Sequence, residues 1–110
     1  MIKEEILDNL QEFVELSARV FLDGNPPHKM CFIISSAIKE LLDAFDIKTQ
    51  IIEGEIYHTD WYHFWLELED GRIIDATAGQ FKKPNGDDMP PVYVGQRPDW
   101  YITDGLLILE

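Results

Sequence analysis

Residues 60–81 read DWYHFWLELEDGRIIDATAGQF. Two runs rich in aromatic and β-branched residues flank an Asp-Gly pair, which predicts a β-hairpin. His63 lies among aromatic residues in the first run, and Asp75 lies inside an otherwise apolar second run. The two side chains can act together only if the hairpin register brings them to one face of the sheet.

The length of the hairpin loop sets that register. A two-residue loop made by the Asp-Gly pair places Leu66 opposite Asp75, and His63 then points to the other face. A three-residue loop, residues 69–71, places Trp65 opposite Asp75 and makes His63 its diagonal neighbour. It also places Thr77 opposite His63. Such loops often end in a glycine with positive φ, as this one would, so the sequence permits the register that joins the pair.

The alternation along residues 61–69 assigns the two faces of this strand. Phe64, Leu66 and Leu68 share the face that we expect to pack against a helix. His63 and Trp65 share the opposite face with Glu67. We therefore expect His63 at the edge of the sheet rather than in the core, and a residue on the helix side would have to reach that edge to meet it.

The flanking segments complete the fold prediction. Apolar residues recur at helical spacing over residues 3–22 and 30–45, and the stretch DGNPPHK separates the two helices. The other predicted strands are residues 48–57, 72–77, 92–95 and 106–110, with a long polar loop over 81–91. This order predicts one α+β domain over residues 1–110, with two N-terminal helices packed on a mostly antiparallel sheet.

Composition limits the classes of partner and compartment. The chain carries 21 acidic and 9 basic residues, a net charge of −12. This charge disfavours nucleic acid and anionic membranes and favours a basic partner, although it also serves solubility. No apolar run approaches a membrane span, the first ten residues lack the pattern of a signal peptide, and a single cysteine cannot form an internal disulfide. We expect a cytoplasmic protein.

Three residues have the chemistry of a thiol enzyme. A free cysteine is only a few per cent thiolate at neutral pH, and a helix N-terminus contributes only about 0.3–1 kcal/mol, less than one pKa unit. Cys31, predicted in the first turn of the second helix, therefore needs a histidinium beside it. His63 is the candidate, and Asp75 would orient its ring and stabilise its charge.

The same residues carry a resemblance to a known family. HFWLELEDGRIIDATAGQF resembles the histidine–aspartate hairpin of the transglutaminase-like superfamily, within the papain-like thiol enzymes. CFIISSAIKELLDAFDIKTQIIEGEI resembles the helix that carries the nucleophile and the strand after it, which Gly54 would end. The resemblance covers about residues 28–81 and implies a minimal papain-like core. It implies Cys31 as nucleophile, His63 as base and Asp75 as orienting acid, without a cofactor.

The reaction implied is acyl transfer from an amide of a protein or peptide: peptide hydrolysis, glutamine deamidation or cross-linking. The oxyanion donor is open between the Cys31 backbone N–H and Asn25, which holds the place where papain-like enzymes often carry a glutamine. Trp61 and Trp65, and also Trp100, are candidates for a cleft wall. Thr77 and Gln80 match the family pattern as structural supports. Met30 and Phe32, which flank Cys31, depart from the small residues usual there.

Two other classes stay open. His28 and Cys31 have the spacing of zinc ligands, and His58 and His63 would complete four ligands. However, His58 and His63 are five residues apart and would face opposite ways on one straight strand. The other alternative is an inactive domain of the same fold that serves as an acidic protein-binding module.

Overall fold

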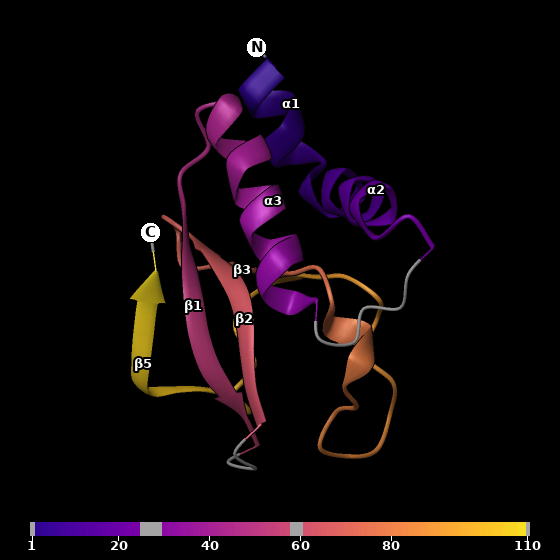
Figure 1. Ribbon diagram of the computed structural model, residues 1–110, viewed down its shortest axis with the longest axis vertical. Helices are drawn as coiled ribbons and strands as arrows, with labels where there is room; N and C mark the ends of the chain where they lie inside the picture. Colours follow the sequence, from indigo (N-terminus) through magenta and orange to yellow (C-terminus); the bar gives the residue numbers. More distant parts are fainter. Residues whose placement is uncertain (1, 25–29, 58–60, 110) are drawn as a thin grey trace.

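The structure, a computed structural model, describes residues 2–24, 30–57 and 61–109, with only the backbone described for Trp61 and residues 104–109. It is an α+β fold, as the sequence predicts. Three helices precede five strands: α1 (Ile2–Asp8), α2 (Leu10–Leu22), α3 (Cys31–Ala44), β1 (Thr49–Ile56), β2 (Trp61–Leu68), β3 (Ile73–Asp75), β4 (Tyr93–Gly95) and β5 (Tyr101–Leu109), with a short 3-10 helix, η1 (Ala78–Gln80), between β3 and β4. Figure 1 shows the helices gathered on one side of the sheet.

The first predicted helix is two helices, which corrects the prediction of one helix over residues 3–22. The break lies at Asn9, whose φ of −123° and ψ of 35° are not helical. Its side-chain amide donates to the carbonyl of Glu5 at 3.0 Å, at the end of α1. Ile6 and Leu10 are buried on either side of the break, so the apolar spacing gave no sign of it.

The five strands form one antiparallel sheet in the order β4-β3-β2-β1-β5. The hairpin has the three-residue loop. Leu66 pairs with Ile74, the Leu68 N–H donates to the Arg72 carbonyl at 2.8 Å, and Gly71 has a φ of 92°. This register is the one that turns His63 and Asp75 to the same face.

Three strand boundaries differ from the prediction. β3 ends at Asp75, so Thr77 does not pair with His63 but precedes η1. β5 begins at Tyr101 rather than at residue 106. Gly54 lies inside β1 rather than at its end, where it pairs with His63. The longer β5 places an additional residue, Tyr101, on the face of the sheet that carries His63.

Each face of the sheet has its own core. Leu66, Leu68 and the half-buried Phe64 pack under the helices, as predicted, against Ile34, Ile38, Leu42 and Val14. The opposite face buries Trp65 and Tyr101 with Ile52, Ile56 and Ile73, and it is covered by the chain that follows β3, through Phe81 and Met89. Among the described residues, no helix is both long and apolar enough to cross a membrane.

Candidate active site

His63 and Asp75 meet on the face of the sheet opposite the helices. The Nε2 of His63 lies 2.8 Å from the Oδ2 of Asp75. The two residues are 1% and 0% exposed, so water does not compete for this contact. A fully buried ion pair is expensive unless its remaining hydrogen-bonding sites are satisfied. The other hydrogen-bond partners of Asp75 therefore matter to the cost of burying this contact.

Asp75 accepts hydrogen bonds on both of its oxygens. The Thr77 backbone N–H donates to Oδ1 at 3.0 Å, and the Thr77 hydroxyl lies 3.4 Å from the same oxygen. Gln80 donates to that hydroxyl at 3.1 Å. The Tyr101 hydroxyl donates to Oδ2 at 2.6 Å. Four donors, including His63, match the acceptor capacity of an ionised carboxylate, which orients its charge toward the imidazole ring.

Cys31 acts on the other end of the imidazole. Because Nε2 is bound to Asp75, the ring nitrogen left for Cys31 is Nδ1, which is buried. The thiol is near enough for each of the two groups to shift the pKa of the other, yet Nδ1 has no partner in strict hydrogen-bond geometry. The thiol and the imidazole are therefore adjacent but do not form a hydrogen bond of strict geometry. Such looseness is common in unliganded catalytic sites.

The pKa values shift in the directions of an ion pair. Burial alone would raise the pKa of Cys31, but the close polar contact and charge of His63 and the backbone N–H groups of Phe64 and Phe32 lower it overall. Burial would lower the pKa of His63, but the charge and hydrogen bond of Asp75, with a smaller contribution from Cys31, raise it to about 9. At neutral pH the imidazole is therefore protonated, and it favours the thiolate of Cys31.

The end of the β2–β3 pairing lets a helix residue reach this face. β2 pairs with β3 only through Leu66 and Glu67, so β3 does not flank the start of β2. Cys31, the first residue of α3, is half-buried and its thiol lies beside the Phe64 N–H of β2. The prediction that His63 lies outside the core was wrong. Its side chain is buried because the chain after β3 returns over it.

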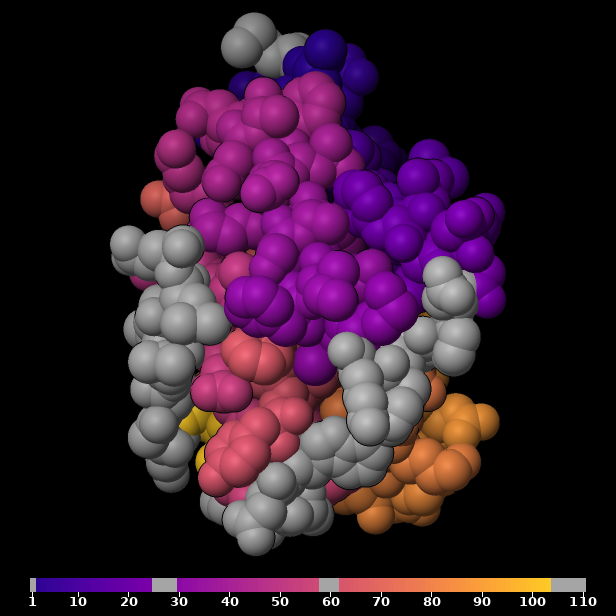
Figure 2. All heavy atoms as spheres, viewed as in Figure 1, coloured from indigo at the N-terminus to yellow at the C-terminus, as the bar shows by residue number. Residues whose placement is uncertain are grey.

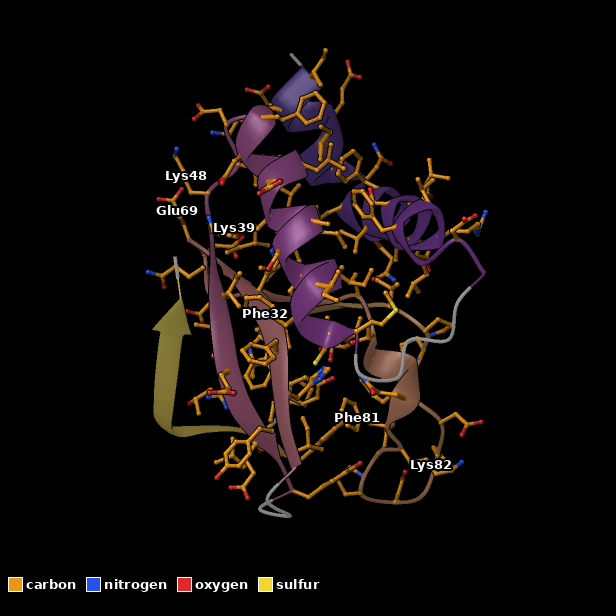
Figure 3. All side chains as sticks on the ribbon, in the orientation of Figure 1. Phe32, Lys39, Lys48, Glu69, Phe81 and Lys82 are labelled. Atoms are coloured by element: carbon orange, nitrogen blue, oxygen red, sulfur yellow. The ribbon has the colours of Figure 1, made fainter. Side chains whose placement is uncertain are left out.

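Aromatic rings surround the histidine. Phe81 meets the His63 ring edge-on, with centroids 4.5 Å apart, and Figure 3 shows it below the first turn of α3. Trp65 is 0% exposed, and its ring lies against the backbone of Gly54 and 5.1 Å from the Tyr101 ring. Trp65 is therefore a core residue and does not wall an open cleft, which corrects our expectation.

Several other candidates are placed differently or not described. Trp100 stacks on Tyr57 with centroids 4.9 Å apart and meets the Tyr101 ring at 4.7 Å. The side chain of Trp61 and the whole of Asn25 lie outside the described residues. The backbone N–H of Cys31 belongs to the first turn of α3, where N–H groups have no acceptor within the helix, so it stays available as an oxyanion donor.

Tyr101 is the functional candidate that sequence reasoning missed. The predicted final strand began at residue 106, which left the aromatic residue outside any element. The signal was present in the segment DWYIT, residues 99–103, where an aromatic and β-branched run follows a proline and a turn. Reading this run as a strand would have placed Tyr101 at a sheet position, although not opposite Asp75.

The described residues contain no group of three or more His, Cys, Asp or Glu side chains that could hold a metal ion. His28 and His58, two of the four zinc ligands considered from the sequence, lie outside those residues.

Comparison with known proteins identifies no relative: no family model, no curated protein and no solved structure matches this chain.

Proposed function

We propose that this protein is a thiol-dependent acyl-transfer enzyme that acts on an amide bond of a protein or peptide, as a peptidase, a glutamine deamidase or a transglutaminase. The observation that supports this most strongly is the series from Asp75 through His63 to Cys31. The carboxylate bonds one ring nitrogen, at 2.8 Å, and the thiol adjoins the other end of the ring. This is the arrangement of nucleophile, base and orienting group that amide chemistry requires.

In the first half-reaction the Cys31 thiolate attacks the carbonyl carbon, and the carbonyl electron pair moves to oxygen. The Cys31 backbone N–H is positioned by the helix start to stabilise that charge. The C–N bond then breaks as the His63 imidazolium gives its Nδ1 proton to the leaving nitrogen. A thioester on Cys31 and a neutral imidazole result, while Asp75 keeps the Nε2 proton in place.

In the second half-reaction water or an amine attacks the thioester. His63 Nδ1 takes a proton from the attacking group, the C–S bond breaks, and Cys31 leaves as a thiolate beside a protonated imidazole. Water yields hydrolysis or deamidation, and an amine yields cross-linking. Cys31 and His63 play the same roles whether water or an amine attacks the thioester.

An exposed apolar surface beside the thiol supports a protein or peptide substrate. Phe32 and Tyr62 are 44% and 61% exposed, and the Phe32 ring meets the Phe64 ring at 5.0 Å. The backbone N–H groups of Phe32 and Phe64 both act on the Cys31 thiol, so the backbone of these two residues lies beside the nucleophile. Figure 2 shows α3 and β2 side by side on this face. We infer that the exposed rings of Phe32 and Tyr62 contact an apolar side chain of the substrate.

A chromogenic ester tests the reaction class without a known substrate. Incubation with p-nitrophenyl acetate should acetylate the protein, detected by intact mass spectrometry, and because the chain has one cysteine a thioester adduct identifies Cys31. Cys31→Ala should remove the adduct, and His63→Gln should slow its formation by about 10²-fold or more. Asp99→Asn, a change at an exposed carboxylate, is the control and should behave as wild type.

Once a natural substrate is found, Cys31→Ala and His63→Ala should each abolish turnover, and the double variant should be little worse than either. Residues that act as one unit are non-additive in this way. Additive losses would contradict a shared mechanism.

The second candidate function is an acidic protein-binding module, and the net charge of −12 favours it. Binding of a basic partner would then survive Cys31→Ala and be lost when several surface carboxylates are replaced. Retention of the full biological effect by Cys31→Ala would select this function over the enzyme.

A further inference from the structure

Tyr101 occupies a position that the thiol chemistry described above does not explain. It begins β5, pairs with Ile56 of β1 and is 0% exposed. Its ring packs between Trp65 and Trp100, with centroids 5.1 and 4.7 Å away. Apolar contacts of this kind would be met equally by phenylalanine. The hydroxyl is the part that needs an explanation, because a buried phenol needs a partner and this one bonds Asp75.

The hydroxyl and the imidazole share one oxygen of Asp75. The distance to Oδ2 is 2.6 Å from the Tyr101 hydroxyl and 2.8 Å from His63 Nε2. Oδ1 is occupied separately by Thr77. The phenol can only donate here, because burial and the charge of Asp75 raise its pKa far above the ordinary value. Two donors thus draw on the negative charge of the same atom.

The described ionisable groups that act on His63 come from three elements: Asp75 from β3, Cys31 from α3 and, through Asp75, Tyr101 from β5. Phe81 and Trp65 add only apolar rings. Cys31 is the group to be activated, and Thr77 donates to the other oxygen of Asp75, so Tyr101 is the donor that shares Oδ2 with the imidazole ring.

We propose that Tyr101 is a positioning residue of the triad: its hydroxyl fixes Asp75 Oδ2 against His63 Nε2 and shares the charge of that oxygen, which limits the basicity of His63. This inference rests on the proposed function, in which His63 must both hold a proton beside the thiolate and release it to the leaving nitrogen. A carboxylate that acted on His63 alone would hold the imidazolium proton too firmly for that transfer.

The test is the pKa of His63, followed by NMR of the ¹⁵N-labelled imidazole. Tyr101→Phe should raise it above the wild-type value, since Asp75 loses a competing donor. Tyr93→Phe is the matched control, because the Tyr93 hydroxyl donates to the Gln96 carbonyl and not to Asp75. It should leave the pKa of His63 unchanged. An unchanged pKa in Tyr101→Phe, with only a lower melting temperature, would reduce Tyr101 to a packing residue and overturn the proposal.

A second substitution guards against a Tyr101→Phe variant that does not fold. Replacement of Tyr101 by 3-fluorotyrosine keeps the ring and strengthens the O–H donor, so the pKa of His63 should fall below the wild-type value. A shift in the opposite direction, or none, would overturn the proposal. Because the titration needs no substrate and no reactive thiol, an unreactive Cys31 would refute the proposed function without changing this result.

Discussion

Asp75 is the residue on which the candidate site depends most. It is fully buried and receives donors from three separate segments: His63 on β2, Thr77 after β3 and Tyr101 on β5. The sequence made Asp75 a candidate because a lone carboxylate lay inside an otherwise apolar run. It did not predict that a tyrosine 26 residues later would complete its hydrogen bonding, since that contact depends on where β5 joins the sheet.

Asp75→Asn should therefore lower the pKa of His63, raise that of Cys31 and destabilise the fold. The amide has no charge to offer the imidazolium, and its NH₂ group must face one of the donors that now bond the carboxylate. Loss of one partner of a buried pair costs roughly 3–5 kcal/mol, measurable by urea unfolding. Asp99→Asn, at an exposed position, should cost less than about 0.5 kcal/mol. Equal stability of the two variants would contradict this role of Asp75.

Within single elements, short-range sequence patterns predicted those features that depend on residues close together in the chain. The sequence permitted the three-residue loop, with a glycine at the place of positive φ, and left the two-residue loop open; the structure has the three-residue loop. Period-two alternation predicted which side of β2 meets the helices. The break at Asn9 was missed because the apolar spacing continues through it. The burial of His63 was missed because the cover comes from Phe81, which returns from a loop read as polar.

Gly54 connects β1 to the site. It pairs with His63, and a Cβ there would lie 2.1 Å from the Trp65 ring and 2.6 Å from the Ile102 carbonyl oxygen. Neither a buried indole nor a paired backbone can retreat at low cost.

Gly54→Ala should consequently destabilise the domain by about 1–3 kcal/mol or more, read as a fall in melting temperature. It should also slow labelling of Cys31, because the displaced indole lies next to His63. Gln50→Ala on the same strand is exposed and provides the control. A Gly54→Ala variant as stable as Gln50→Ala would show that Trp65 is not fixed against β1.

For the whole molecule, the site influences how the free energy of unfolding depends on pH. The pKa of His63 is raised and that of Cys31 is lowered, so the two groups have opposite effects. His63 has a raised pKa, so the stability it contributes is present below its unfolded pKa of 6.5 and is lost as pH rises through about 9. Cys31 has a lowered pKa, so its contribution is present at high pH and is lost as pH falls. Wild type should therefore show a shallow pH dependence of stability.

Cys31→Ala should remove this compensation. The free energy of unfolding of this variant should fall as pH rises above 6.5, because the unfolded imidazole loses its proton before the folded one does. In this variant Asp75 still raises the pKa of His63 but Cys31 no longer does, so the loss should be smaller than the wild-type pKa of about 9 would give. Denaturant titrations at a series of pH values measure it. If the free energy of unfolding of the double variant Cys31→Ala/His63→Gln fell equally steeply with pH, groups other than His63 would cause the pH dependence.

The rate of Cys31 alkylation by iodoacetamide, measured as a function of pH, tests most directly whether His63 activates the thiol. The folded protein should show a Cys31 pKa below the value of about 8.5 for free cysteine; His63→Gln should raise it, and full denaturation should return it to about 8.5. A wild-type pKa at or above 8.5, unchanged in His63→Gln, would contradict a thiolate–imidazolium pair and with it the proposed enzyme.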